Sequence, residues 1–335
     1  DQVGAQSGNL ARNAVLASCL PESVPGTTVD RQCGSSQQAI HFAAQAVMSG
    51  TQDVVIAGGV EAMSMVPIGA SVKDGFDAGH GFPFNAEGIA KRYPGVFFSQ
   101  FTGAELVAEK WKLSREDLDK FALESHQKAK HATEMKYFDS EILPLAGRNE
   151  HNDNDMVLAD EGIRFDASLE ALAGLNPVTE GGVITAGNAS QITDGAAAIM
   201  ICNDAGLKKI KTNPRAKIIA LSVVGDDPVF MLTGPIPASH DVLARAKMSI
   251  DDMDIYEVNE AFAPVPLAWA IELGADKAKL NVNGGAMALG HPLGATGAKL
   301  MTTMLHELER REGKYALQAI CEGGGTANAT IIERI

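Results

Sequence analysis

Cysteine is scarce in this sequence of 335 residues, which has four: Cys19, Cys33, Cys202 and Cys321. Their spacing matches no zinc motif, and four cysteines in so long a chain do not make a disulfide framework. A reducing compartment is therefore expected, with each thiol considered separately, and we predict no metal site.

Long apolar runs and an excess of positive charge are also missing. No run approaches the ~18 residues that a membrane span needs, and the first residues, "DQVGAQSGNLARNAV", lack the basic and apolar regions of a signal peptide. The net charge is −14 and no Lys/Arg-rich run stands out, which argues against nucleic acid or an anionic membrane as a partner. A small anionic ligand could still be held by a few cations and helix N-termini.

The composition is that of an ordinary globular protein, with 45% hydrophobic and 21% charged residues. Residues 1 to 62 are rich in Gly, Ala and Val, and the run "DVVIAGG" predicts a buried strand. Residues 63 to about 192 begin Met-rich and irregular and then become helical. From about 193 to the end, strands and helices return.

Two helix starts are marked by capping patterns. Ser114 with Asp117 fits a capping box, and Leu118, Phe121 and Ala122 follow at helical spacing. The stretch "MSIDDMDIYEV" predicts a second capped helical turn that leads into a strand.

The first and last regions share a weak internal repeat. One copy reads "RQCGSSQQAIHFAAQAVMSGTQDVVIAGG" and the other "GHPLGATGAKLMTTMLHELERREGKYALQAICEGGG". In each, a turn of small residues precedes a helix, and a strand ending in glycines follows. We therefore predict two similar α/β halves with a long insertion.

Cys33 lies in "DRQCGSSQQAI". The residues Gly34, Ser35 and Ser36 suit a sharp turn and an N-cap of a helix beginning near Ser36. The thiol would then face the positive end of that helix, which lowers a thiol pKa and favours a nucleophile. The alternative is a buried structural cysteine, and the segment alone leaves both open.

Cys321 stands where the hydrophobic run "YALQAI" gives way to three glycines. This is expected to be the C-terminal edge of a sheet, where α/β proteins place their chemistry and where glycine N–H groups can bind an oxyanion. Taken alone, a small core residue is the better interpretation. Cys19 and Cys202 have no such surroundings, and we assign both to packing.

His291 lies in "NVNGGAMALGHPLGATGAKL", between Gly290 and Pro292. The flanking glycines let the backbone run close to a ligand or another loop, which favours a functional histidine over a merely packed one. His126 and His131 fall on a charged helical segment, and His41 among alanines indicates packing.

The stretch "YEVNEAFAPVP" places Asn259 and Glu260 between a short strand and an apolar turn. A polar pair entering an apolar stretch needs partners, so it is either a helix N-cap or part of a site.

Together these segments resemble the thiolase family. The motifs "CGS" at 33–35, "NEAF" at 259–262, "GHP" at 290–292 and "CEG" at 321–323 occur in the order and approximate spacing of that family, and "GNASQITDGAAA" at 187–198 is similar to a further thiolase segment. The likeness runs from the first residues to the last.

The resemblance implies an α/β fold with a five-layered α/β/α/β/α core made of two similar halves. The first half would comprise residues 1–62 plus 193–205, the inserted loop domain residues 63–192, and the second half residues 206–335. Thiolases carry a further strand and helices before the point where this chain begins, so we expect residue 1 to fall inside the first half.

The resemblance also implies CoA-dependent thiolytic cleavage of a 3-ketoacyl-CoA. Cys33 would be the nucleophile that carries the acyl group, His291 the base, and Cys321 the acid/base at the α-carbon. Asn259 would hold a water that, with His291, binds one thioester oxygen. The backbone N–H groups of Cys33 and Gly323 would form a second oxyanion hole.

On the same basis Ser190, Ala261 and Phe262 would line the pantetheine channel. Coenzyme A would be a cosubstrate, no cofactor would be bound permanently, and acyl-CoA and CoA would be the partners of a homodimer or homotetramer. A cytoplasmic location is expected, although a targeting segment before residue 1 would be invisible here.

One segment departs from the short-chain, biosynthetic pattern. Ser99 and Gln100 stand where those members have a His-Met pair, which favours a degradative enzyme acting on medium, long or bulky acyl chains. Phe97, Phe98 and Phe101 suit loop-domain core or an acyl pocket equally. The other interpretations are acetoacetyl-CoA synthesis, a ketoacyl-carrier-protein synthase, which Cys321 argues against, and a non-catalytic acyl-CoA or sterol carrier.

Overall fold

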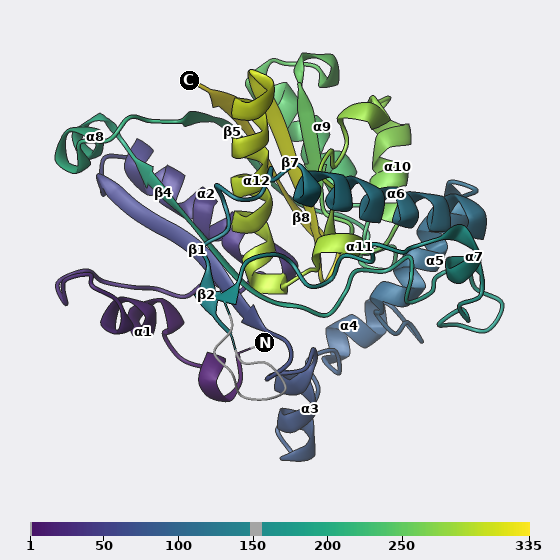
Figure 1. The fold of residues 1–335 in the computed structure, drawn as a ribbon. Coiled ribbons are helices and arrows are strands. Elements are labelled where there is room, and N and C mark those ends of the chain that lie inside the picture. The colour runs from purple at the N-terminus through teal and green to yellow at the C-terminus, as the bar shows by residue number, and fades with distance from the viewer. Residues whose placement is uncertain (1, 148–155) are drawn as a thin grey trace.

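The fold was analysed in a computed structural model, which describes residues 2–147 and 156–335 (Figure 1). In chain order, with η for a 3-10 helix, the elements are η1 (Gly4–Gln6), α1 (Leu10–Ala17), η2 (Gln32–Gly34), α2 (Ser35–Met48), β1 (Val54–Ala62), α3 (Ala70–Asp77), α4 (Glu87–Arg92), α5 (Gln100–Lys110), α6 (Arg115–Glu134), β2 (Leu145–Ala146), β3 (Met156–Val157), α7 (Leu169–Ala173), β4 (Asp194–Cys202), α8 (Asp204–Ile210), β5 (Ala216–Gly225), α9 (Pro235–Ala246), η3 (Ile250–Asp252), β6 (Ile255–Val258), α10 (Pro264–Leu273), η4 (Lys277–Lys279), α11 (Ala286–Leu289), η5 (Leu293–Ala295), α12 (Thr296–Arg311), β7 (Tyr315–Glu322) and β8 (Thr326–Arg334).

Two sheets organise the molecule. The larger has the strand order β5-β8-β7-β6, in which β7 runs parallel to β6 and antiparallel to β8. The smaller pairs β1 with β4 in antiparallel register, from Val54 opposite Cys202 to Ala62 opposite Asp194. Residues 63–193 are therefore an insertion between the two paired strands, which begins after β1 and ends before β4.

Helices α2 and α12 lie between the two sheets. Helix α2 packs on β1 and β4, whereas α12 contacts β1 and β4 on one side and β6 and β7 on the other. The helices also meet each other, and the backbone N–H of Ala298 donates to Ser36 Oγ at 2.9 Å. Helix α9 packs against β5, β8 and β7 on the side away from α12 (Figure 1). The predicted α/β fold is confirmed.

The internal repeat is visible in the order of elements. A short 3-10 turn, a helix and a strand follow one another as η2, α2 and β1, and again as η5, α12 and β7. Each strand then pairs with an antiparallel neighbour, β4 or β8. The chain thus builds the same unit twice and packs the two helices against each other.

Strand β1 corrects one expectation. The run "DVVIAGG" is a strand, but Ile56 and Val60 are 49% and 42% exposed, so the prediction of a buried strand is wrong. Only the face that carries Val55 and Ala57 packs on the hydrophobic cluster of α2. Alternation of side chains across a strand leaves the other face in solvent.

The predicted helix starts are confirmed. Helix α6 begins after a capping box in which Asp117 N donates to Ser114 Oγ and Ser114 N to the Asp117 carboxylate. The buried residues of α6 include Leu118, Phe121 and Ala122. A second capping box precedes η3 and leads into β6.

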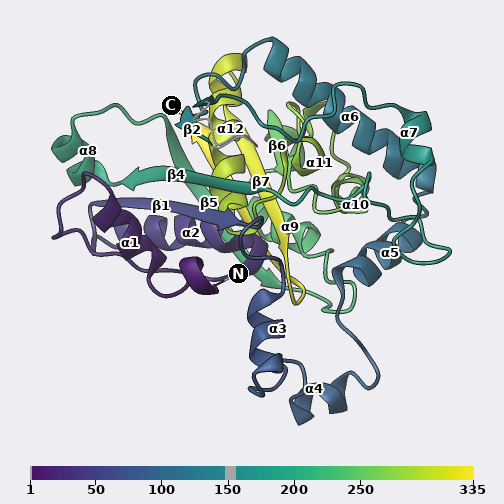
Figure 2. The same cartoon turned by 60° about the horizontal axis from the view of Figure 1, so that its bottom comes forward.

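The region between β1 and β4 falls into two parts. In both views α3 and α4 project away from the sheets, while α5 and α6 lie beside α10 and α11 and α7 lies against α6 (Figures 1 and 2). Helix α6 contacts α11, just before His291, and α5 contacts α10. Among the described residues, no helix is long and apolar enough to cross a bilayer.

Candidate active site

Cys33 lies in the tight turn η2, directly before α2, and is 2% exposed. The preceding residue, Gln32, has φ +46°, a backbone conformation that costs of order 1–3 kcal/mol in a non-glycine residue and that clusters at functional sites. The predicted sharp turn is confirmed. The predicted N-cap is also confirmed, because Gly34, one of the three residues named for it, is the N-cap of α2, although no side chain caps the helix.

The expected low pKa of Cys33 is also wrong. Burial, together with the nearby Glu322 carboxylate, raises the pKa of the Cys33 thiol to about 12, and Glu61 acts in the same direction. The position before a helix is real, but desolvation of the thiolate outweighs it. Cys33 is therefore a neutral thiol at rest and needs a base to become a nucleophile.

Cys321 occupies the last but one position of β7 and is 1% exposed, at the sheet edge predicted for it. Strand β7 contacts η2, which places Cys321 near Cys33. Burial raises the pKa of the Cys321 thiol well above its usual range, and the neighbouring Cys33 adds to this. Gly323 follows in the turn, and its α-carbon faces the Gln32 side chain, next to Cys33.

His291 is 3% exposed and held through both ring nitrogens. The Thr296 hydroxyl donates to the Pro292 carbonyl at 2.9 Å, so it accepts from His291 Nδ1–H, 2.6 Å away. Burial and the cation of Lys299 lower the pKa of His291 to about 3, which makes the ring neutral. A neutral ring with a proton on Nδ1 carries its basic lone pair on Nε2.

Asn259 directly follows β6 and lies beside this basic nitrogen. Its Nδ2 lies 3.2 Å from His291 Nε2, and its backbone N–H donates to Ala319 O on β7. The Oδ1 atom is buried and accepts no hydrogen bond from a described residue. Asn259 therefore links His291 to the strand that carries Cys321.

Glu260 is a structural anchor, not an N-cap, because α10 begins at Pro264. Its buried carboxylate accepts from Ser125 Oγ at 2.7 Å, Asn281 Nδ2 at 2.9 Å and the Met287 N–H at 3.2 Å. A Cβ on Gly285 would lie 2.3 Å from its carboxylate carbon. Glu260 thus joins α6 to the glycine-rich segment before His291.

The glycines around His291 mostly serve contacts within the protein. Gly290 has φ +80°, and a Cβ there would lie 2.0 Å from Thr193 Oγ1. Such a position excludes every other residue. The room for acyl-CoA that these glycines were expected to provide stays a prediction.

The residues predicted for the pantetheine channel lie together. Ser190 N–H donates to Ala261 O at 3.0 Å, and the Phe262 ring packs edge-on against Phe101 at 5.4 Å between centroids. Ala261 and Phe262 are buried. Phe98 is partly buried on the core, Phe101 touches the core through Phe262 but is 45% exposed, and Phe97 is 74% exposed.

The predictions for the other cysteines and histidines are confirmed only in part. Cys19 is exposed, so its assignment to packing is wrong, while Cys202 is partly buried. His41 is fully buried, with Nε2 2.8 Å from Thr330 Oγ1. His126 accepts the Arg164 N–H at 3.1 Å, and His131 is exposed on α6.

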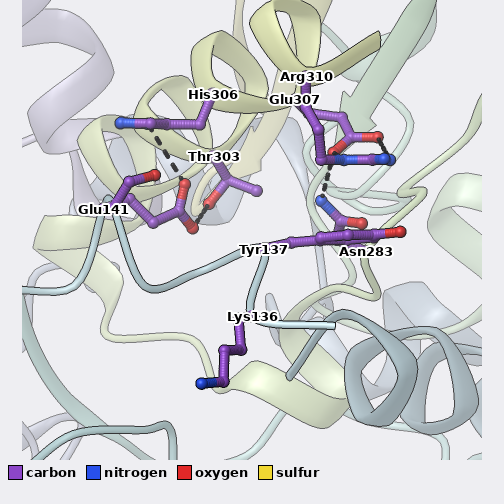
Figure 3. Close-up of a pocket in the computed structure, with 9 residues that line it drawn as sticks. Lys136, Tyr137, Glu141, Asn283, Thr303, His306, Glu307 and Arg310 are labelled. Carbon is purple, nitrogen blue, oxygen red and sulfur yellow. Dashed lines mark hydrogen bonds and ion pairs between the residues drawn. The ribbon is translucent and has the colours of Figure 1, made fainter. Parts of the chain in front are cut away.

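A second polar cluster lines a cavity of about 200 Å³ that contains none of the predicted site residues (Figure 3). Glu141 accepts from Thr303 Oγ1 at 2.8 Å and lies 3.4 Å from His306 Nδ1. Burial raises the pKa of Glu141 to about 7. The Arg310 guanidinium pairs with Glu307 and stacks 3.8 Å from the centre of the Tyr137 ring.

Sequence reasoning missed Thr296, Arg31 and Glu322. The signal for Thr296 was its place one turn beyond His291, where an orienting partner for the second ring nitrogen is needed. Arg31 and Glu322 flank the two motif cysteines, but nothing local indicates that they pair. In the described part of the chain, no three His, Cys, Asp or Glu side chains form a group that could hold a metal.

Comparisons with known proteins agree along the whole chain. Residues 2–205 match the family described as "Thiolase, N-terminal domain", and residues 212–334 match "Thiolase, C-terminal domain". Steroid 3-ketoacyl-CoA thiolase FadA6 of Mycobacterium tuberculosis is 53% identical over 100% of this chain and 81% of its own length. The 3-ketoacyl-CoA thiolase of Aliivibrio fischeri is 41% identical over 98% of this chain and 84% of its own.

Solved structures give the same result. Human mitochondrial 3-ketoacyl-CoA thiolase superposes with a TM-score of 0.88 at 37% identity, covering 100% of this chain and 85% of the human one. A structure of that human enzyme in complex with CoA superposes with a TM-score of 0.87.

Proposed function

This chain belongs to the thiolase family, and we propose that Cys33, His291 and Cys321 together carry out the thiolytic cleavage of a 3-ketoacyl-CoA. The protein is an acyltransferase of the degradative 3-ketoacyl-CoA thiolase type, with CoA as cosubstrate. The observation that carries the assignment of roles is the hydrogen-bonded chain from Pro292 O through Thr296 to His291. It leaves a neutral imidazole whose Nε2 can accept a proton.

In the first step the Cys33 thiol gives its proton to His291 Nε2 as its sulfur attacks the 3-keto carbon. Because the pKa of Cys33 is about 12, proton removal and attack have to be coupled. The carbonyl oxygen gains negative charge, which the backbone N–H groups of Cys33 and Gly323 would stabilise. One such donor is worth about 3–4 kcal/mol in the transition state.

In the second step the bond between C2 and C3 breaks. The electron pair moves to C2, and the Cys321 thiol gives its proton to that carbon, so acetyl-CoA leaves and a Cys321 thiolate remains. A thiol with a pKa well above its usual range is suited to hold its proton until a carbanion forms beside it.

In the third step CoA cleaves the acyl-enzyme. The CoA thiol loses its proton to the Cys321 thiolate and attacks the thioester on Cys33, and the shortened acyl-CoA leaves. The departing Cys33 sulfur takes back the proton held by His291. Asn259 keeps its amide beside His291 Nε2 throughout, and a water held there would bind the thioester oxygen.

The substrate is a medium, long or bulky 3-ketoacyl-CoA. The name of the mycobacterial relative supports a bulky, steroid-type acyl group, and the pair Ser99-Gln100 at the start of α5 argues against a short, acetoacetyl substrate. The partly exposed Phe101, against Phe262, offers an apolar surface for such a group. The assembly as a homodimer or homotetramer and the cytoplasmic location stay predictions.

Intact mass spectrometry tests the roles directly. The protein is mixed with a 3-ketoacyl-CoA, and any adduct is located by peptide mapping. We expect an acyl group on Cys33 that added CoA removes, no adduct in Cys33→Ala, and an unchanged adduct in the control Cys19→Ala, because Cys19 is exposed. Acyl-CoA binding should persist in Cys33→Ala.

Two outcomes would contradict the proposal. Turnover retained by Cys33→Ala would exclude Cys33 as nucleophile. Acyl-CoA binding with no adduct on any cysteine would favour a carrier on the same fold. Relative rates on acetoacetyl, long-chain and steroid side-chain CoA esters would then rank the substrates.

A further inference from the structure

Glu322 directly follows Cys321 on β7, and its side chain is completely buried. One carboxylate oxygen, Oε2, accepts from Arg31 Nε at 2.6 Å and from Thr326 Oγ1 at 2.8 Å. A buried carboxylate with two such donors is held in one place, because breaking either contact leaves a charged atom unsatisfied.

The ion pair joins the two segments that carry the thiols. Arg31 lies two residues before Cys33, and its backbone N–H donates to Ser35 Oγ at 2.9 Å, across the turn η2. Glu322 lies between Cys321 and Gly323. The Arg31–Glu322 contact therefore connects the loop before one thiol with the strand end that bears the other.

The second carboxylate oxygen points at the turn itself. A Cβ on Gly34 would lie 1.9 Å from Glu322 Oε1, so Oε1 rests on the α-carbon next to Cys33. This oxygen is buried and accepts no hydrogen bond from a described residue. The carboxylate as a whole is paired with Arg31 through Oε2, while Oε1 has no donor of its own among the described residues and lies against the turn that carries Cys33.

The groups that face this charge are few. Arg31 and Thr326 bind Oε2, the charge of Glu322 acts on the thiols of Cys33 and Cys321, and the carboxylate of Glu61 also acts on Cys33. The negative charge of Glu322 raises the pKa of both Cys33 and Cys321, while its own pKa is raised by burial to about 7.

We propose that Glu322 is a positioning residue for thiolysis: paired with Arg31, it fixes the turn after Cys321 against the loop before Cys33 and places a negative charge beside both thiols. This inference rests on the proposed function. It assigns to Glu322 two effects, on the geometry of the Cys33 and Gly323 N–H groups and on the ionisation of Cys33.

The charge has a chemical consequence for the nucleophile. It opposes the thiolate in the resting enzyme, so proton transfer to His291 has to accompany attack. A thiolate of higher pKa is also intrinsically more nucleophilic. Glu322 thereby keeps Cys33 unreactive until a substrate carbonyl is in place.

The test compares the wild type with Glu322→Gln and with the matched control Glu124→Gln, which removes the same charge from the exposed face of α6. The rate of alkylation of Cys33 by iodoacetamide is followed from pH 6 to 11 by peptide mass. Gln keeps an oxygen for Arg31 and Thr326 but carries no charge. In Glu322→Gln we therefore expect the alkylation curve of Cys33 to move to lower pH by on the order of one unit, which is the pKa shift that a single nearby charge produces.

A second variant separates geometry from charge. Thr326→Val removes one hydrogen bond to Glu322 but keeps the carboxylate, so kcat for thiolysis should fall about tenfold with the pH curve of Cys33 unmoved. The pH dependence of kcat/KM with a 3-ketoacyl-CoA is measured for the same proteins. It takes the place of the alkylation rate if the buried Cys33 thiol does not react with iodoacetamide.

The outcomes are distinct. An unmoved curve in Glu322→Gln, a shift to higher pH, or an equal shift in Glu124→Gln would overturn the proposal. Failure of the proposed function would appear elsewhere, as the lack of an acyl adduct on wild-type Cys33. Where the Cys33 thiol reacts with iodoacetamide, its alkylation curve can be measured whether or not an acyl adduct forms.

Discussion

Replacing Thr296 by valine should disable His291 without touching a thiol. The substitution keeps the shape of the side chain but removes the hydroxyl that accepts from His291 Nδ1–H at 2.6 Å. The Nδ1–H group is then buried with no acceptor in its place. The imidazole can relieve this by moving its proton to Nε2, which removes the basic lone pair that the proposed first step uses.

The expected loss follows from the cost of a buried unpaired donor. Leaving such a group without a partner costs about 1–3 kcal/mol, and the tautomer that avoids the cost is inactive as a base. If this energy appears in the barrier to acylation, the rate falls roughly 10-fold to 100-fold. Neither the Cys33 thiol nor the Asn259 contact is altered directly.

The assay is single-turnover acylation of Cys33, with KM for the 3-ketoacyl-CoA measured in parallel. Thr302→Val on the same helix is the matched control, since its hydroxyl donates only to the helix carbonyl of Ala298 at 2.9 Å. We expect the acylation rate to fall in Thr296→Val and to stay within about twofold of the wild type in Thr302→Val. Nitrogen-15 NMR of the His291 ring should show Nδ1 protonated in the wild type.

Two results would refute the reasoning. A wild-type acylation rate in Thr296→Val would mean that Thr296 does not set the protonation state of the base. An equal loss in Thr302→Val would point to a general disturbance of α12. A rise in KM with an unchanged acylation rate would place the effect on substrate binding instead.

Three further predictions concern other contacts. Cys321→Ala should still be acylated on Cys33 by acetyl-CoA but should exchange carbon–carbon bonds about 100-fold more slowly or worse, measured with labelled acetyl-CoA; a normal exchange rate would exclude the acid/base role. Gly285→Ala should lower the free energy of unfolding by about 1–3 kcal/mol, because its Cβ meets the Glu260 carboxylate; Gly75→Ala, with open space around it, should not lower it. The pKa of the Glu141 carboxyl is raised to about 7 in the native state, so the wild type loses stability as pH rises from 5 to 8 and this buried group becomes charged. Glu141→Gln has no such group, so its free energy of unfolding in urea should increase relative to that of the wild type by up to roughly 3 kcal/mol over this range. A difference between the two proteins that does not change with pH would contradict this.

The local elements could be predicted because their signals are local. A turn of small residues, a helix and a strand that leads into glycines appear in this order in both "RQCGSS…" and "GHPLGA…", and the structure has η2, α2, β1 and η5, α12, β7 at these places. The capping boxes at Ser114 and Ser249 are likewise contained in four residues each. The division into two halves and a loop domain stays a prediction.

The burial of β1 could not be predicted in the same way. Hydrophobic side chains at Val54, Ile56 and Val60 indicate a strand, but the period of a strand says nothing about which neighbours cover each face. In the structure α2 covers the face of Val55 and Ala57. The other face carries Ile56, half exposed.

The prediction of a low pKa for Cys33 was wrong for a related reason. A helix start beside a thiol is a local pattern and favours the thiolate. Burial favours the thiol, and Glu322 adds to it from a position 289 residues later in the chain. Because desolvation of a fully buried group shifts its pKa by several units, the long-range effects outweigh the local one.

The geometry of the candidate site likewise depends on contacts that no short segment contains. Cys33 and His291 each stand just before one of the two repeated helices, and these helices are fixed to each other at their N-termini by the hydrogen bond from Ala298 N to Ser36 Oγ. The repeat therefore predicts that both residues lie at the same end of a helix, but not that the two ends meet. That meeting requires the two units to pack helix to helix, with α12 in contact with both sheets. A change that loosens α2 from α12 should consequently reduce acylation of Cys33 even when every motif residue is intact.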